Sequence, residues 1–265
     1  MTSARFYRQR AGLLAAMVLT GIATAVAGEI APADRKSGYD FMSAQARAMQ
    51  DDDTANPGML SVLDGEASWN KKAGAAQKSC ADCHGDATTS MQGVAARYPA
   101  YDAAHGRPIT LPQRINLCRS ENQKATPFPA ENAEWLALSA FVGQQSRGMP
   151  ITPPDDSRLA ATLEKGRALY FLRQGQLNLS CAQCHDDNWQ QKLSGNPIQQ
   201  GQATGYPVYR LEWQGMGSLE RRLRNCMFGV RAEPFAYGSE QHLALALYLR
   251  ARAAGLKIET PAVRP

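Results

Sequence analysis

After its first 27 residues, the sequence has no long hydrophobic run. No later segment approaches the 18 uninterrupted apolar residues that a membrane-spanning helix needs, so no span is predicted in the mature chain. The sequence also lacks stretches in which apolar and polar residues alternate cleanly, so extended sheet is not expected to dominate. The formal net charge is only +5, which gives no support for nucleic-acid binding.

The first 27 residues have the composition of a secretory signal peptide. Arg5, Arg8 and Arg10 form a basic start, the following residues are small and apolar, and Ala25-Val26-Ala27 matches an A-x-A cleavage site. We therefore predict an exported, periplasmic protein whose mature form carries a formal charge of +2. An uncleaved amino-terminal anchor is the alternative.

Six cysteines would suggest disulfide bonds in an exported protein, but four of them lie in two C-x-x-C-H motifs. In this motif the two thiols add to the vinyl groups of haem c, and the histidine binds the iron. A zinc site or a redox C-x-x-C motif is the alternative, and two copies argue against it. We predict two covalently bound haem c groups, held by Cys80, Cys83 and His84 in the first copy and by Cys181, Cys184 and His185 in the second.

The surroundings of the two motifs repeat along the chain. A glycine precedes each motif by 15 residues, at Gly65 and Gly166. A Tyr-Pro pair stands 20 residues before a lone cysteine in each copy, with Cys118 in the first and Cys226 in the second. Such self-similarity indicates an internal duplication.

The duplication and the helical periodicity together predict a mainly α fold with two tandem cytochrome c-type domains. We place the first domain at residues 60–150 and the second, catalytic domain at 151–265, with a Pro-rich linker between them at 148–156. Helices are expected near 131–147, 156–174 and 240–254. Residues 28–59 are predicted to form an amino-terminal arm, with a short helix at 41–49, that packs on the first domain.

The sixth ligand of each iron decides the chemistry of a haem protein. Methionine and histidine are the usual candidates, but none of them outside the motifs pairs off in the repeat, whereas Cys118 and Cys226 do. We predict that each cysteine binds the iron of its own domain as a thiolate, which favours the ferric state and a low potential. A disulfide between these two cysteines is the alternative.

Arginines are concentrated around the second of these cysteines. Arg222 lies four residues before Cys226, on one helix face if Ser218 begins a helix as its N-cap, and Arg221 and Arg224 flank it. A guanidinium group beside a sulfur lowers the sulfur's pKa and offers a fork for an oxyanion. The first copy keeps Arg114 but has Gln113 and Asn116 in place of the flanking arginines, so we expect the chemistry in the second copy. A solvated basic surface is the alternative.

With these motifs, and with Arg222-Leu223-Arg224-Asn225-Cys226-Met227, the sequence resembles the dihaem form of the SoxA family of the periplasmic thiosulfate-oxidising Sox system. The resemblance covers the mature chain. It implies His/Cys ligation of both irons, a catalytic persulfide on Cys226 and substrate binding by Arg222. It further implies that thiosulfate is joined to a cysteine of a SoxYZ carrier. The electrons would leave through a monohaem SoxX subunit to a soluble cytochrome c acceptor.

Three other functions are compatible with two haems. In a purely electron-transferring dihaem cytochrome, both lone cysteines would only tune the potential. A dihaem peroxidase or gas sensor would need an open iron position. A structural binding module is the third, and two covalent haems argue against it.

Overall fold

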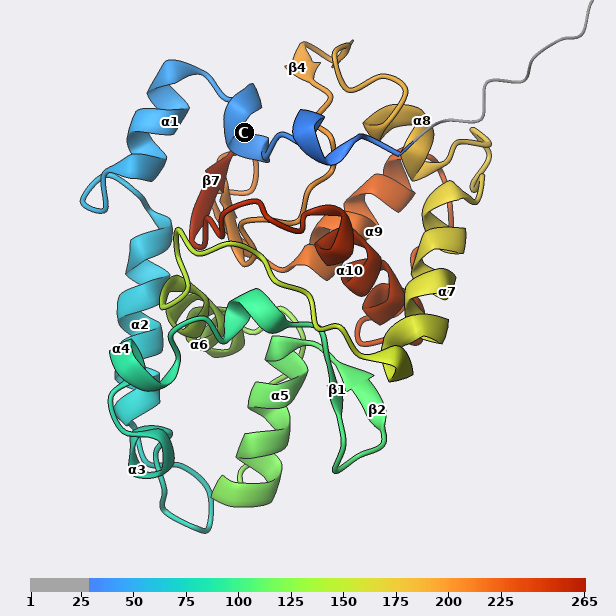
Figure 1. Ribbon diagram of the computed structural model, residues 1–265. Helices are drawn as coiled ribbons and strands as arrows, with labels where there is room; N and C mark the ends of the chain where they lie inside the picture. The colour runs from blue at the N-terminus through green and yellow to red at the C-terminus, as the bar shows by residue number, and fades with distance from the viewer. Residues whose placement is uncertain (1–28) are drawn as a thin grey trace, which may run out of the picture.

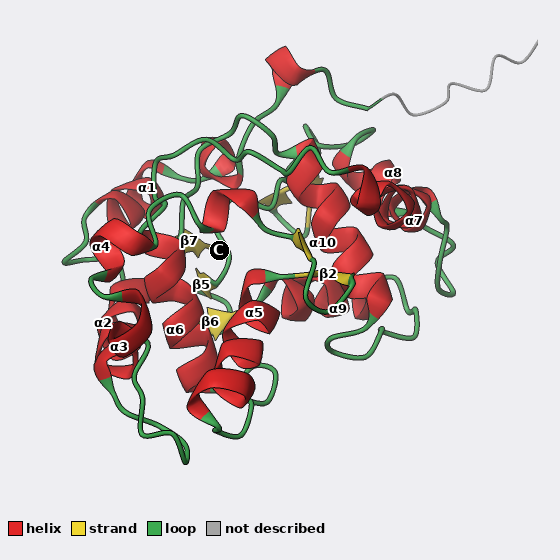
Figure 2. Cartoon of the chain, turned by 60° about the horizontal axis from the view of Figure 1, so that its bottom comes forward, coloured by secondary structure: helices red, strands yellow, loops and turns green. Residues whose placement is uncertain are grey.

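The computed structural model describes residues 29–265, so the predicted signal peptide at 1–27 lies outside the described part. The fold is mainly helical, as predicted, and its strands are only two or three residues long (Figure 2). None of the helices in the described part is long and apolar enough to cross a membrane.

The amino-terminal arm contains two 3-10 turns and helix α1 (Pro32–Asp34, Gly38–Phe41, Ala44–Asp51). It was expected on the first domain, and Arg147 of that domain donates to the Gln50 carbonyl at 3.0 Å, but the arm also runs along the second half and the carboxyl-terminal strand (Figure 1). The Lys36 backbone N–H donates to Gln200 Oε1 at 2.7 Å, and Gln50 Oε1 accepts the Val263 N–H at 3.0 Å. Buried amides that satisfy distant backbone groups therefore fix the arm.

The first half begins with helix α2 and ends with helix α6, which pack against each other (Figure 1). Between them lie the first haem motif, a hairpin and the helix that carries the first lone cysteine. In chain order, its elements are α2 (Gly58–Asn70), α3 (Ala81–His84), α4 (Ala87–Ser90), a 3-10 turn (Ala95–Arg97), β1 (Ala100–Asp102), β2 (Arg107–Ile109), α5 (Leu111–Cys118), a π-helical turn (Arg119–Gln123) and α6 (Ala133–Gln144).

The second half repeats this order, with helices α7 and α10 packed together. In chain order, its elements are a 3-10 turn (Ser157–Leu159), α7 (Ala160–Phe171), α8 (Cys181–His185), β3 (Lys192–Leu193), β4 (Asn196–Pro197), β5 (Val208–Arg210), β6 (Gly215–Gly217), α9 (Leu219–Gly229), α10 (Glu240–Arg252) and β7 (Ala262–Arg264). Strand β5 pairs antiparallel with β6 and parallel with β7.

The glycines found in the repeat mark the helix crossings. A side chain at Gly65 would collide with the Ala137 carbonyl of α6, and one at Gly166 would collide with the Ala244 carbonyl of α10. Both Tyr-Pro peptide bonds are cis, and each precedes the hairpin of its half. The same close approach and the same chain path therefore recur in both halves.

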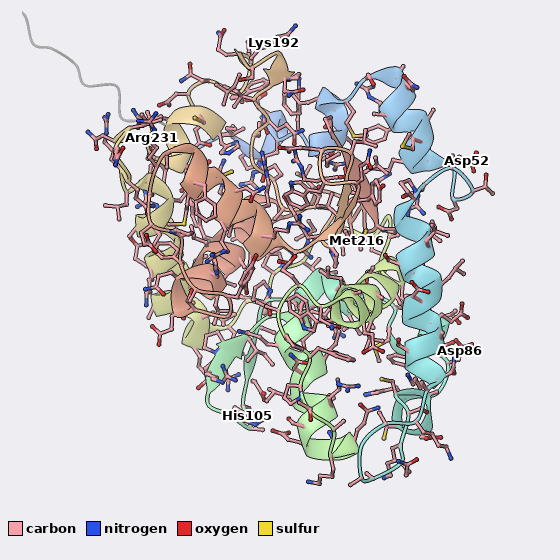
Figure 3. The ribbon with its side chains drawn as sticks, turned by 180° about the vertical axis from the view of Figure 1, so that it is seen from behind. Asp52, Asp86, His105, Lys192, Met216 and Arg231 are labelled. Atoms are coloured by element: carbon pink, nitrogen blue, oxygen red, sulfur yellow. The ribbon has the colours of Figure 1, made fainter. Side chains whose placement is uncertain are left out.

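The two halves are joined by more than the linker. The residues after α6 pair with the segment that follows α10, through Gly148 N–H to Ile258 O and Ile151 N–H to Leu256 O, both at 2.8 Å. Met216 of strand β6, labelled in Figure 3, packs against the apolar core of the first half. The hairpin of the second half therefore lies at the junction between the halves.

Candidate haem-binding and anion-binding sites

The second C-x-x-C-H motif forms the short helix α8. Ser180 is its N-cap: the Ser180 hydroxyl accepts the Gln183 N–H at 3.3 Å, and Gln183 Oε1 accepts the Ser180 N–H at 2.9 Å. This capping box fixes the helix start at Cys181, so that Cys181 and Cys184 share one helix face. Burial raises the pKa of the Cys181 thiol to about 12, and the neighbouring Cys226 adds to the effect.

The His185 ring is held by the loop that follows α8. Its Nδ1 lies 2.5 Å from the Gln199 carbonyl oxygen, which can only accept, so Nδ1 carries the proton and Nε2 is left to bind a metal ion. Gly201, at a positive φ of 70°, brings the backbone against this ring, because a Cβ there would lie 3.0 Å from His185 Cγ. The loop thus sets the tautomer and the orientation of the predicted axial ligand.

The half-buried Cys226 lies on helix α9, which begins after Ser218 as predicted; the Ser218 hydroxyl accepts the Arg221 N–H at 3.1 Å. Burial raises the pKa of the Cys226 thiol, but a hydrogen bond with His185 and the positive charges of Arg222 and Arg210 outweigh it and bring the pKa to about 7. The structure therefore brings the second lone cysteine together with the histidine of the second motif.

In the first half the lone cysteine lies near the two motif thiols. Cys118 ends helix α5, and burial raises the pKa of Cys80 to about 11, with Cys118 contributing next. Burial also raises the pKa of Cys118, where Cys83 contributes as well. All six cysteines, which lie in the described part, are free, so the alternative disulfide between Cys118 and Cys226 is not formed.

These residues fit haem c. Each half gathers two thiols one helical turn apart and a third sulfur beside a partly buried apolar wall, which is the surface that a covalently attached porphyrin needs. In the second half the motif imidazole also contacts the third sulfur, whereas His84 of the first half is exposed beside Trp69. Around the first motif this wall contains Met91, Val94, Leu111, Ile115 and Phe128. Around the second motif it contains Leu163, Leu169, Leu219, Leu223 and Phe235.

Two of the arginines near Cys226 are among the largest influences on its pKa. Arg222 acts from its own helix, as predicted, and Arg210 acts from the end of strand β5. The flanking arginines were expected to add to this site, but they are used elsewhere. Arg221 stacks on Trp213, with its guanidinium carbon 4.2 Å from the ring centroid, and Arg224 donates to the Phe235 carbonyl.

The equivalent arginine of the first half is paired instead. Arg114 Nη1 lies 3.2 Å from Asp102 Oδ2, at the end of strand β1. His105 Nδ1 lies 2.7 Å from the same oxygen, and His105 Nε2 lies 2.6 Å from Glu121 Oε1. His105, labelled in Figure 3, belongs to the loop between β1 and β2 beside helix α5. The first half thus surrounds its arginine with acidic groups.

Comparison with known proteins gives the family. The SoxA/TsdA cytochrome c domain matches the chain twice, at residues 64–151 and 165–258. The chain belongs to the SoxA/TsdA cytochrome c domain family. It is 43% identical to the L-cysteine S-thiosulfotransferase subunit SoxA of Pseudaminobacter salicylatoxidans and 38% identical to that of Rhodovulum sulfidophilum. Each match covers 86% of this chain and 80% of the relative.

A solved structure agrees with this assignment. The crystal structure of SoxXA from P. pantotrophus superposes with a TM-score of 0.84 at 34% identity, covering 87% of both chains. The predicted family resemblance, the two cytochrome c domains and an enzyme subunit of the sulfurtransferase class are thereby confirmed. Membership of a SoxA/TsdA cytochrome c family also implies covalently bound haem c. The number of haems and the axial ligands stay predictions.

Three features of the site were missed from the sequence. The first is the equivalence of Arg210, an arginine near Cys226 in the sequence, to Asp102: both directly follow Tyr-Pro-x-Tyr, so an alignment of the two copies could have found it. Asp186, next to the second motif, is buried, bonded to Tyr170 and paired with Arg252 Nη2 at 2.5 Å. No local pattern points to the third feature, the Gln199 carbonyl, because its role depends on how the loop folds back.

Proposed function

We propose that this chain is the catalytic subunit that joins thiosulfate to a cysteine thiol of a sulfur-carrier protein of the SoxYZ type. The overall reaction converts a carrier thiol and thiosulfate into a carrier S-thiosulfonate, one proton and two electrons. The observation that carries the proposal is the placement of Cys226 beside His185, Arg222 and Arg210. The relatives named above support it by their recorded activity.

The two haems would be attached through the paired cysteines of each motif. His84 and Cys118 would be the axial ligands of the first iron, and His185 and Cys226 those of the second. When bound, haem c supplies a one-electron acceptor in a fixed position. The capping box of α8 and the Gln199 carbonyl hold the thiols and the imidazole of the second site in place.

Cys226 would cycle between an iron-bound state and a free state, and in the free state it would perform the sulfur chemistry. Its thiolate forms an S–S bond with the sulfane sulfur of thiosulfate, and two electrons leave the sulfur pair for the electron acceptor. The carrier thiolate then attacks the same sulfane sulfur, and the Cys226 thiolate leaves, which restores the starting state and gives the carrier S-thiosulfonate. A thiolate that Arg222 and Arg210 stabilise suits both roles, because it must attack in the first step and leave in the second. A persulfide on Cys226 would extend the same nucleophile by one sulfur.

Arg222 would bind the substrate. Its half-buried guanidinium lies one helical turn before Cys226, and it has no carboxylate partner within salt-bridge distance among the residues that the structure describes. A cation of this kind attracts and orients the sulfonate end of the thiosulfate dianion. The sulfane sulfur would then point toward Cys226.

The electrons would pass to a monohaem cytochrome subunit of the SoxX type and then to a soluble cytochrome c. The assembly in the SoxXA crystal structure supports the first of these partners. We place the reaction in the periplasm, on the basis of the predicted leader at residues 1–27.

The test is a pair of matched variants, Cys226→Ala and Cys118→Ala, purified with their haems. Intact mass would count two haems in each. We expect Cys226→Ala to lose about 1,000-fold or more in thiosulfate-dependent turnover, as for removal of a nucleophile, and Cys118→Ala to keep most of it. A Cys226→Ala protein with two haems and full turnover would contradict the proposal and favour a purely electron-transferring cytochrome.

A further inference from the structure

We propose that Arg210 is a second substrate-positioning residue and that Asp102, its counterpart in the duplication, closes the first half to anionic substrates. The position at the end of the hairpin's first strand would then decide which half accepts thiosulfate. This inference rests on the proposed function, since it assigns the anion site of the same reaction.

The hairpin and the helix place Arg210 toward Arg222. Arg210 is the last residue of β5 and pairs with Gly215 of β6, and its side chain is 14% exposed. One guanidinium nitrogen, Nη2, lies 2.8 Å from Glu212 Oε2, whereas Nε is buried and has no hydrogen-bond partner in the described part of the chain. Arg210 therefore keeps a donor that the protein itself does not satisfy, which is costly unless a ligand satisfies it.

Two cations share this site. Burial lowers the pKa of Arg210, and the nearby positive charge of Arg222 lowers it further. Like charges held this close in a partly buried site repel each other, and an anion between them relieves the repulsion. Thiosulfate is a small dianion, and the fork of Arg222 together with the free Nε of Arg210 can bind it and fix its orientation. Glu212 occupies only Nη2 of Arg210, and its side chain is 61% exposed, so water screens its charge far more than that of the buried Asp102.

The first half has the same frame with the opposite charge. Asp102 ends β1 as Arg210 ends β5, and it pairs with Arg107 of β2 in the equivalent register. Its carboxylate lies 3.2 Å from Arg114 Nη1, and its side chain is 4% exposed. Arg114, the counterpart of Arg222, is therefore already neutralised, and an incoming anion would meet a buried carboxylate.

The experiment is a graded series at one position, Arg210→Lys, Arg210→Gln and Arg210→Asp, in the haem-loaded complex as purified. Equilibrium dialysis without carrier gives the Kd for radiolabelled thiosulfate. Steady-state turnover with carrier gives KM and kcat. We expect Arg210→Gln to raise Kd and KM about 10- to 100-fold, which is the range for loss of one charged hydrogen bond, with a smaller change in kcat. Arg210→Lys keeps the positive charge, so it should lose less affinity for thiosulfate than Arg210→Gln.

Arg210→Asp should weaken binding more than Arg210→Gln, because the new carboxylate would pair with Arg222 as Asp102 pairs with Arg114. A purely structural role for Arg210 would not give this order of Lys, Gln and Asp. The matched control is Arg221→Gln, which removes one positive charge from the same helix and a cation from the same Trp213 ring. It should leave Kd unchanged.

Wild-type Kd in all three Arg210 variants, or equal losses in Arg210→Gln and Arg221→Gln, would overturn the inference and leave the proposed function intact. Failure of the wild-type complex to bind thiosulfate would instead overturn the proposed function. The two failures are therefore distinguishable in one set of measurements.

Discussion

The two halves share a frame, which consists of the helix crossing, the hairpin and the helix with the lone cysteine. They differ in the charges around that lone cysteine, Cys118 or Cys226. Gly65 and Gly166 make the same helix crossing, and each hairpin leads into a helix that ends in or carries the lone cysteine. At Cys118 burial raises the pKa and outweighs the positive charge of Arg114, and the negative charges of Glu121 and Asp102 add to the rise. At Cys226 hydrogen bonding and nearby cations overcome burial and bring the pKa to about 7. Duplication has therefore preserved the frame that fits the cofactor while the electrostatics have diverged.

The halves also differ in how firmly their histidines are held. His185 is half-buried, and the Gln199 carbonyl fixes its ring, while the neighbouring Asp186 is buried and paired with Arg252. His84 is exposed and its ring lies 5.7 Å from that of Trp69. A more enclosed and more strongly hydrogen-bonded site suits sulfur chemistry, because water exclusion strengthens the electrostatic contacts within it.

The largest contrast between the halves is expected from their equivalent arginines. Arg222→Gln should lower kcat/KM for thiosulfate about 100-fold, since it removes the positive charge one helical turn before Cys226 that lowers the pKa of this cysteine. Arg114→Gln should change it by less than about 3-fold, because Arg114 is already paired with Asp102. Steady-state turnover of the two purified variants with carrier checks both values, and similar losses in both would break the comparison.

A smaller effect is expected from the acidic cluster of the first half. Hydrogen bonds to Asp102 and then to Glu121 raise the pKa of His105, and the hydrogen bond from His105 lowers the pKa of Asp102. The contribution of His105 to stability is therefore full below the ordinary histidine pKa of about 6.5 and is lost as the pH rises through its raised value. The contribution of Asp102 is lost as the pH falls through its own lowered value.

Thermal unfolding of the wild type and His105→Gln across pH tests this cluster. The wild type should be the more stable of the two near pH 6, and the difference should shrink steadily as the pH is raised toward about 9. A difference that stays constant over this range would show that His105 acts by packing rather than by charge. No counterpart is expected in the second half, where Trp213 occupies the equivalent place.

Much of the frame was predictable because it rests on local or repeated signals. Spacing alone predicts the capping residue Ser218, the glycines at the helix crossings and the equivalence of Cys118 and Cys226 in the repeat. The contacts of the arm with the second half were not predicted, because they depend on single buried amides, Gln50 and Gln200, that bond to segments more than 160 residues away.

The contacts that each arginine of helix α9 makes were equally hard to predict from the sequence. Arg221, Arg222 and Arg224 lie within one turn of the same helix, and only their partners distinguish them: Trp213 for the first, the Cys226 site for the second and the Phe235 carbonyl for the third. Arg210 joins the site from a hairpin, so helical spacing could not have included it.

The most direct test of the account is to locate the sulfur that the protein acquires from its substrate. The haem-loaded complex would be incubated with thiosulfate and an oxidant for its haems, digested without reducing agent, and analysed by peptide mass spectrometry. We predict that the added sulfur or thiosulfonate is found on the peptide containing Cys226 and not on the one containing Cys118. Equal labelling of both peptides, or labelling of Cys118 alone, would contradict the conclusion that the charge difference between the halves directs the chemistry.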